Sequence, residues 1–435
     1  MFALIANSFA AEVNVMMPLN TINLDGSVRD MNYVKNAMTK MRDAGVHGII
    51  IDVWWGIAEP QPNVYKFDGY LQVFEMARSL GLKMEPIMSF HKCGGNVGDS
   101  VTIPIPKWVL DVATPKKLFY ADQWGTMADE YISAAANYEK VFPSKSGDLR
   151  TPLTMYNDYM RAFRSAAVQF FNDKTIDQVQ IGLGPCGELR YPSYPLSRWS
   201  YPGVGAFQAF DPLMVKMFQE KAKAAGYDYQ SPPTDAGTYN SRPEQTQFFT
   251  TTYKSTYGMF FMTFYQGLLL EHAQDILEIS REVFSGTPLT SKVSGIHWWY
   301  GHDSHAAELT AGYYNVLSMG KNAYEQIEAV FGDVQFDFTC MEMTDQGHAG
   351  ENCNSKPEEL VRQCVDAVKQ HAGTMSGENA LETYSSQSYD QILNQLRYGK
   401  GYLNQFAYMR QTDQLIYNDG FYNQFKDFVA KAKNI

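Results

Sequence analysis

The sequence has 435 residues, with 36 lysines and arginines against 47 aspartates and glutamates, which gives a formal net charge of −11. An acidic protein repels a phosphate backbone, so we expect no nucleic-acid partner. Hydrophobic residues make up 45% of the chain and aromatic residues 14%, which favours a large packed core over disorder. No stretch of about 18 consecutive apolar residues is present, so we expect no membrane-spanning segment.

The chain begins with a short apolar segment. Residues 1–11 are interpreted as an apolar leader or a vestigial signal segment, because they lack a basic residue and their apolar run covers only residues 2–5. The localisation therefore stays open between cytoplasmic and secreted. The five cysteines form no Cys-x-x-Cys pair, so neither a disulfide framework nor a zinc ribbon is indicated.

Strand and helix signals alternate along the rest of the chain. The segment GIIIDV (residues 48–53) is a continuous apolar run, which is typical of a strand buried on both faces. Strands are predicted, in chain order, at residues 12–19, 48–53, 83–90, 176–183, 291–298, 334–341, 374–378 and 402–409. Apolar residues at helical spacing predict helices at residues 27–44, 70–80, 156–171, 260–283, 323–331, 357–371, 388–396 and 422–433.

Eight strands separated by helices predict an α/β fold, a single closed (β/α)8 TIM barrel that spans residues 12–435. An open doubly wound sheet is the alternative. Polar residues at the strand ends favour the barrel, because those ends converge on one face; they are Asp52, His91, Glu188, His297, Glu342, Glu378 and Arg410. Long stretches between strands predict loop insertions after strands 3, 4 and 5.

Two glutamates occupy the most distinctive segments. Glu188 lies in GPCGELRYPSYP (residues 184–195), where partial burial would disfavour the charged carboxylate, as a general acid requires. A structural ion pair with Arg190 is the alternative. Glu378 ends the penultimate predicted strand, and its alternative is a glutamate that satisfies free N–H groups at a helix start. Two carboxylates on facing strands are what glycoside hydrolysis needs.

The segment HKCGGNVGD (residues 91–99) places three glycines before Asp99. Its spacing is neither G-x-G-x-x-G nor a P-loop, so a phosphate cradle is not indicated. We interpret the segment as a mobile lid that delivers Asp99 to a bound substrate, with an ordinary flexible surface loop as the alternative.

A third segment, HWWYGHDSH (residues 297–305), holds three histidines, but their spacing matches no zinc motif, and we expect neither a metal nor a cofactor. Two tryptophan pairs, at residues 54–55 and 298–299, suit sugar recognition because rings stack on apolar faces and polar neighbours bond hydroxyls. Packing at the rim of the barrel is the alternative for both pairs.

These segments together resemble the β-amylase family, in order and over essentially the whole chain. The motifs are IDVWWGIAEPQP (51–62), SFHKCGGNVGD (89–99), GPCGELRYPSYP (184–195), SGIHWWY (294–300), HAAELTAGYYN (305–315), FTCMEM (338–343) and GENAL (377–381). The resemblance implies a (β/α)8 barrel that releases β-maltose from the non-reducing ends of α-1,4-glucans with inversion. It implies a glucan substrate, a maltose product and no metal, and we expect a monomer.

The resemblance also implies roles for individual residues. Glu188 matches the general acid, and Glu378 matches the base that activates water. Asp99 matches the lid aspartate, and Thr339 matches a threonine that stabilises the deprotonated acid. The remaining matches are sugar-binding positions: Asp52, His91, Lys292, His297, Asn379, Ala380, Leu381 and Arg410.

Two features differ from the family pattern. The chain ends just after the eighth predicted helix, so we expect no separate starch-binding domain. The segment TDQGHAGENC (residues 344–353) is unlike the family, which puts the outer subsites in doubt. A retaining or endo-acting glycosidase and a catalytically inactive glucan-binding barrel are the alternatives to an active exo-acting enzyme.

Overall fold

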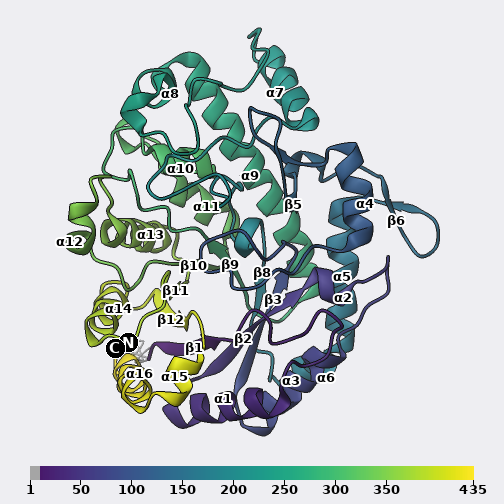
Figure 1. Cartoon of the computed structure of the whole chain (residues 1–435), viewed down its shortest axis with the longest axis vertical. Coiled ribbons are helices and arrows are strands. Elements are labelled where there is room, and N and C mark those ends of the chain that lie inside the picture. Colours follow the sequence, from purple (N-terminus) through teal and green to yellow (C-terminus); the bar gives the residue numbers. More distant parts are fainter. Residues whose placement is uncertain (1–9) are drawn as a thin grey trace, which may run out of the picture.

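The computed structural model describes residues 10–435, so most of the proposed leader, residues 1–9, lies outside the described residues. Eight parallel strands close into a barrel, and helices surround it (Figure 1). The strands are β1 (Glu12–Met16), β2 (Gly48–Trp54), β3 (Lys83–Ser89), β8 (Val179–Ile181), β9 (Leu289–Val293), β10 (Gln335–Phe338), β11 (Met375–Glu378) and β12 (Leu403–Tyr408).

Closure is visible at β1, which pairs in parallel with both β2 and β12. Val15 lies opposite Ile49 on one side and Tyr408 on the other. This pairing confirms the predicted barrel and rules out the open sheet. Each predicted strand is present, and the chain visits the strands in the order in which they neighbour one another.

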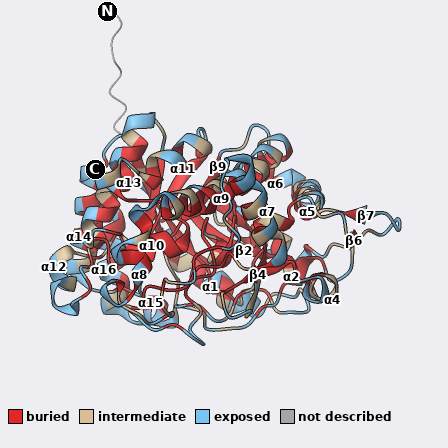
Figure 2. Cartoon of the chain, turned by 90° about the horizontal axis from the view of Figure 1, so that it is seen from above, coloured by how far each residue is buried: buried red, intermediate tan, exposed pale blue. Residues whose placement is uncertain are grey.

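The helices that cover the barrel follow the predicted alternation. They are α1 (Met31–Ala44), α3 (Asp68–Ser79), α5 (Pro152–Ala166), α6 (Val168–Asn172), α9 (Thr256–Val283), α11 (Ala323–Phe331), α13 (Pro357–His371), α14 (Ser386–Tyr398) and α16 (Asp419–Ala432). Figure 2 shows buried residues on the strands and inner helix faces, and exposed residues on the outer helix faces. This distribution is expected for helices that present one apolar stripe to a sheet.

Several element boundaries differ from the sequence prediction. The helix expected from residue 27 begins at Met31, because the Asp30 side chain accepts the N–H of Tyr33 at 2.9 Å and caps it. The strand expected to reach residue 298 ends at Val293, since the N–H of Ser294 donates to the Tyr313 hydroxyl (3.0 Å) instead of a neighbouring strand. The helix expected at residues 156–171 is divided into α5 and α6.

The predicted insertions after strands 3, 4 and 5 are present, and they follow β3, β8 and β9. They contain the small antiparallel pairs β4 (Phe119–Ala121) with β5 (Met127–Ile132) and β6 (Phe142–Pro143) with β7 (Leu149–Arg150). They also contain the short helices α4 (Lys107–Lys116), α7 (Pro212–Ala224), α8 (Gln247–Thr250) and α10 (Ala306–Ala311). Beyond these insertions lie α2 (Trp55–Ala58), α12 (Asp345–His348) and α15 (Asp413–Tyr417).

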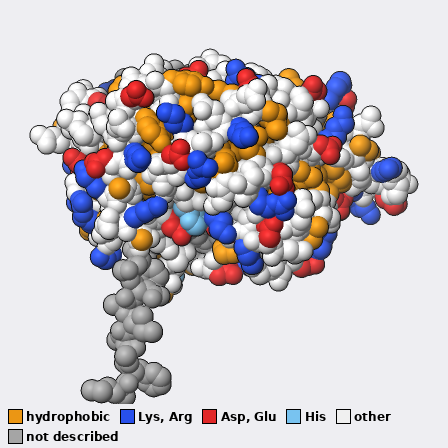
Figure 3. Space-filling view, turned by 90° about the horizontal axis from the view of Figure 1, so that it is seen from below, with side chains coloured by type: hydrophobic (Ala, Val, Ile, Leu, Met, Phe, Trp, Pro, Cys, Tyr) orange, Lys and Arg blue, Asp and Glu red, His pale blue; other side chains and the backbone are white. Residues whose placement is uncertain are grey.

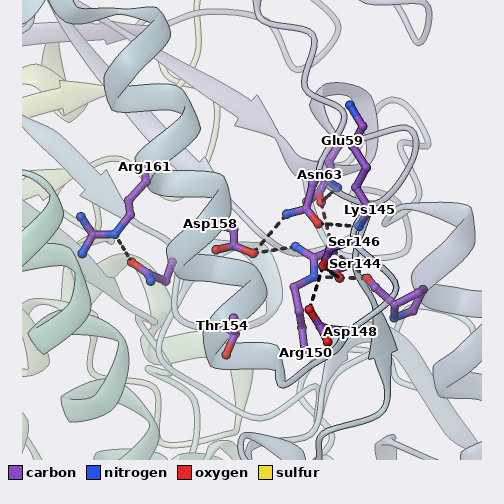
Figure 4. A network of polar contacts seen from close by, with 12 residues as sticks. Glu59, Asn63, Ser144, Lys145, Ser146, Asp148, Arg150, Thr154, Asp158 and Arg161 are labelled. Atoms are coloured by element: carbon purple, nitrogen blue, oxygen red, sulfur yellow. Dashed lines mark hydrogen bonds and ion pairs between the residues drawn. The ribbon is translucent and has the colours of Figure 1, made fainter.

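A buried ion-pair network fixes the β6–β7 hairpin (Figure 4). Arg150 lies 3.4 Å from a carboxylate oxygen of Glu59 and 2.9 Å from one of Asp158. Asn63 donates a hydrogen bond to the same Asp158 oxygen at 3.1 Å. The network therefore joins the segment after α2, the hairpin and α5 into one unit.

The surface carries charges of both signs. Figure 3 shows acidic and basic side chains interspersed over one face of the molecule. Among residues 10–435, no helix combines the length and apolar character needed to cross a membrane.

Candidate active site

The C-terminal ends of the barrel strands bring the predicted site residues to one end of the barrel. Asp52, Lys292 and Glu378 lie at or near the ends of β2, β9 and β11. His91, Glu188, His297, Thr339, Asn379, Ala380, Leu381 and Arg410 follow the ends of their strands. Parallel strands in a closed barrel all point the same way, so residues far apart in sequence share one mouth.

Glu378 and Lys292 form the central contact of this site. The Lys292 ammonium lies 2.8 Å from Oε2 of Glu378, and both side chains are buried. Burial raises the pKa of Glu378, while the ammonium opposes that rise. Burial alone would lower the pKa of Lys292, but the nearby carboxylates of Glu378 and Asp337 raise it overall. The pair is therefore a deeply buried carboxyl group in contact with a lysine whose charged form is favoured by its acidic neighbours.

Glu188 lies in a tight turn after β8. Its backbone forms a parallel bridge with Lys292, and the N–H of Leu189 donates to the Lys292 carbonyl at 2.8 Å. Its Oε2 accepts a hydrogen bond from Nε of Arg190 at 2.6 Å, so the ion pair weighed from the sequence is present. Lys292 thus borders Glu188 through its backbone and Glu378 through its side chain, which brings both glutamates to one residue.

Asp52 and His91 lie on the side of the mouth formed by β2 and β3. Asp52 accepts a hydrogen bond from the Ser89 hydroxyl at 2.9 Å and lies 3.5 Å from the Arg410 guanidinium. His91 packs edge-on against Trp54, and burial lowers its pKa to about 4, so its imidazole is neutral at pH 7. Nδ1 of His91 has no hydrogen-bond partner among the described residues.

The segment after β11 is held by the loop that follows the neighbouring strand β10. The Glu342 carboxylate accepts the N–H groups of Ala380 at 3.1 Å and Leu381 at 2.8 Å. Asn379 donates to the Leu381 carbonyl at 2.9 Å and accepts the N–H of Met409 at 2.8 Å. Leu381 is nevertheless 51% exposed, so an apolar side chain stands on a rigid backbone beside Glu378.

Thr339 lies on the inner loop after β10. Its hydroxyl is buried and has no hydrogen-bond partner among the described residues. A Cβ at Gly295 would lie 2.6 Å from the Thr339 methyl carbon and 2.5 Å from the Cys340 sulfur, so only glycine permits this close approach. The inner loop is thereby packed directly on the segment that follows β9.

Asp99 is bound to its own loop. Its Oδ2 accepts the N–H groups of Gly94 and Asn96, both at 2.9 Å. Gly94, Gly95 and Gly98 have positive φ angles of 116°, 112° and 86°, a region that favours glycine. The glycines of this segment therefore shape a tight loop around the aspartate.

The comparisons with known proteins identify the family. The family model described as glycosyl hydrolase family 14 matches residues 14–435. The chain belongs to glycosyl hydrolase family 14. Among curated proteins it is 40% identical to a beta-amylase of Trifolium repens, over 96% of this chain and 86% of that protein. It is 41% identical to beta-amylase 5 of Arabidopsis thaliana, over 92% of this chain and 82% of that protein.

Among solved structures, the barrel is similar to the catalytic domain of the beta-amylase from Paenibacillus polymyxa. The TM-score is 0.80 at 29% sequence identity, and the match covers 98% of this chain and 99% of that chain. These findings confirm the resemblance inferred from the motifs. The chain is a glycoside hydrolase of family 14, with the barrel of that family.

The two tryptophan pairs do not have the sugar-stacking role that the sequence suggested for them. The indole N–H groups of Trp54 and Trp55 donate to the Leu19 carbonyl and to Glu59. Those of Trp298 and Trp299 donate to backbone carbonyls of the segment at residues 202–203. All four tryptophans are buried, so the packing alternative is correct and their faces are not free for sugars.

The histidines of the segment at residues 297–305 have separate partners. His297 bonds the Ser355 hydroxyl at 2.7 Å, and His305 bonds Glu308 at 2.5 Å. Within residues 10–435, no three histidine, cysteine, aspartate or glutamate side chains are grouped so as to hold a metal. His348, from the divergent segment 344–353, stands against the His297 ring with centroids 5.2 Å apart. The divergent segment therefore borders a predicted sugar-binding residue.

Some contacts of the site escaped the sequence reasoning. Ser89 orients Asp52, and Glu342 fixes the backbone that follows Glu378. The position of Glu342 just after a predicted strand did mark it as a candidate, but nothing in its motif indicated that its carboxylate accepts backbone N–H groups. Apart from Glu188, motif spacing gave no sign of the residues that contact Arg190, namely Asn96 and Cys186.

Proposed function

We propose that this family 14 protein hydrolyses the α-1,4 linkages of starch- or glycogen-type glucans and releases β-maltose from non-reducing ends with inversion. Glu188 is the general acid and Glu378 is the general base. The observation that supports this assignment best is the position of Lys292, which contacts the Glu378 carboxylate and is joined through its backbone to Glu188. It gathers the two acidic groups at one mouth.

The contacts of the two glutamates suit different roles in the reaction. Arg190 bonds Oε2 of Glu188 and leaves Oε1 to carry the proton for the leaving oxygen. Lys292 favours the carboxylate form of Glu378, which draws a proton from the attacking water. Inversion requires room for that water, so the two carboxyl groups of an inverting enzyme stand about 6.5–9.5 Å apart.

Other residues bind the sugar or stabilise the negative charge that Glu188 carries after it has given up its proton. The Thr339 hydroxyl, which has no hydrogen-bond partner within residues 10–435, supplies a donor to Glu188 once Glu188 has lost its proton. Nδ1 of His91, which has no partner in the described part of the chain, and the carboxylate of Asp52 offer hydrogen bonds to sugar hydroxyls. Exposed Leu381 inserts beside a glucose unit, and Asp99 closes over the substrate on its glycine-rich loop. We expect the insertions after β3, β8 and β9 to close one end of the site, as exo action requires.

The relatives favour an active enzyme. Those reported above are named beta-amylases, and nothing in the comparisons supports a glucan-binding barrel without turnover. We also expect the protein to act without a metal and as a monomer.

Two substitutions test the assignment. Glu188→Gln and Glu378→Gln should each lower kcat by roughly 100-fold or more while retaining maltose binding, whereas Glu382→Gln, an exposed neighbour, should leave kcat unchanged. Azide should restore turnover to Glu378→Gln and yield β-maltosyl azide. Robust activity in either glutamine variant would refute the assignment.

The product of the unaltered protein separates the alternatives. NMR of fresh digests should show β-maltose first. Initial α-maltose would indicate a retaining enzyme, and rapid loss of starch viscosity would indicate endo action. Tight maltose binding with no release from soluble starch would establish the inactive glucan-binding barrel.

A further inference from the structure

A cluster of polar side chains surrounds Arg190, the residue that binds the Glu188 carboxylate. Arg190 bonds Glu188 through Nε and donates from Nη2 to Oδ1 of Asn96 at 3.3 Å. Nδ2 of Asn96 donates to Oε1 of Glu130, on β5, at 2.7 Å. Asn96 and Arg190 are both buried, so a carboxamide from the Asp99 loop stands between an acid and the arginine that holds Glu188.

The chemistry of these partners fixes the orientation of the Asn96 amide. A carboxylate only accepts hydrogen bonds and a guanidinium only donates them. The NH₂ group of Asn96 must therefore face Glu130, and its carbonyl must face Arg190. An aspartate here would place a second negative charge against Glu130, and a leucine would bond neither partner.

Glu130 holds a second part of the same turn. Its Oε1 also accepts the N–H of Cys186 at 3.2 Å, two residues before Glu188. Cys186 has a φ of 56°, a conformation that side-chain-bearing residues seldom adopt without support. Burial raises the pKa of Glu130 to about 7, and Arg190 opposes this rise. One carboxyl group thus supports both the Asn96 amide and the backbone that carries Glu188.

Asn96 also belongs to the loop that carries Asp99. Its backbone N–H binds Asp99, while its side chain binds Arg190. The conformation of this loop and the position of the arginine are therefore set by the same residue. No other hydrogen bond within residues 10–435 joins the side chains of the Asp99 loop to Arg190.

We propose that Asn96 is a positioning residue that couples the Asp99 loop to the general acid through Arg190, with Glu130 as the anchor that orients its carboxamide. This inference rests on the proposed role of Glu188 as the acid. With the loop in place, Asn96 holds Arg190 on Oε2 of Glu188 and keeps Oε1 directed at the leaving oxygen.

Substrates that differ in their need for a proton test this coupling. A maltooligosaccharide such as maltoheptaose needs protonation of its leaving oxygen, whereas the fluoride of α-maltosyl fluoride departs without it. Asn96→Ala should lower kcat on maltoheptaose about 10- to 100-fold, because misplacing a reacting group by about 1 Å has such an effect. On α-maltosyl fluoride its kcat should fall less than about threefold.

Variants of Glu130 extend the test. Glu130→Ala should reproduce the Asn96→Ala pattern, and Glu130→Gln, which keeps an acceptor oxygen, should recover most of the lost activity. Asp129→Asn is the matched control, because the Lys92–Asp129 ion pair (2.9 Å) joins the same two segments without touching Arg190. It should leave both substrates unaffected. Thermal melts of each variant establish that it is folded.

Each outcome has a distinct meaning. Equal losses on both substrates in Asn96→Ala would overturn the coupling and indicate that Asn96 serves only the fold or sugar binding. Unchanged rates on maltoheptaose would overturn it as well. If Glu188→Gln itself lost as much activity on the fluoride as on maltoheptaose, the acid assignment would fail, independently of the Asn96 result.

Discussion

A buried carboxyl group outside the active site makes stability depend on pH in a calculable way. Glu328 lies on α11 with 1% of its surface exposed, and neither carboxylate oxygen has a hydrogen-bond partner among the described residues. A Cβ at Gly373 would lie 1.8 Å from Oε1, so the carboxyl group packs directly against the chain that enters β11. Burial raises the pKa of Glu328 to about 7.

The sign and size of the effect follow from the difference between folded and unfolded states. The unfolded chain releases this proton near 4.5 and the folded chain near 7, so the contribution of Glu328 to stability is greatest at low pH and falls as the pH rises through that range. Between pH 5 and pH 8 the expected loss of unfolding free energy is about 2.5 kcal/mol. For 435 residues this corresponds to roughly 3 °C in Tm.

Glu328→Gln removes the titrating group and isolates this contribution. Between pH 5 and pH 8, the unfolding free energy of the variant should fall by about 2.5 kcal/mol less than that of the parent. Urea unfolding at both pH values measures this difference, which is insensitive to any constant cost of the buried amide. Glu278→Gln, an exposed glutamate on α9, is the control and should follow the parent. Parallel stability curves for Glu328→Gln and the parent would refute the argument.

The barrel was predictable because its signals are local. Apolar runs such as residues 48–53 mark strands buried on both faces, and helical spacing marks the outer helices. The pairs β4–β5 and β6–β7 carry no such signal, because β5 includes Asp129 and Glu130 and is held by contacts with distant loops. Boundaries also depended on single side chains, as the cap from Asp30 shows.

The site was predictable as far as strand ends determine it. Lys292 and Glu378 meet because β9 and β11 flank β10 in the barrel. Contacts between loops cannot be predicted from strand ends. Asn96 and Glu130 lie 34 residues apart and meet only because the insertion after β3 folds back on itself. Tryptophan composition suits both stacking and packing, and only burial separates the two.

Two further substitutions probe electrostatics in the interior. Lys292→Met should move the acidic limb of the kcat/KM profile to higher pH. Without the lysine, burial raises the pKa of Glu378 unopposed, so its carboxylate forms only at higher pH. An unmoved limb would contradict the role of the lysine. Arg150→Met should lower the unfolding free energy at pH 7 by about 3–5 kcal/mol, because Glu59 is fully buried and loses its charged partner (Figure 4). Arg161→Met, which breaks an exposed ion pair with Glu282, is the matched control and should cost about 1 kcal/mol or less. Burial raises the pKa of Glu59, so the loss in Arg150→Met should shrink as the pH is lowered and Glu59 takes up a proton. Equal losses in the two variants, or a loss in Arg150→Met that does not change with pH, would show that the network in Figure 4 does not depend on its charges.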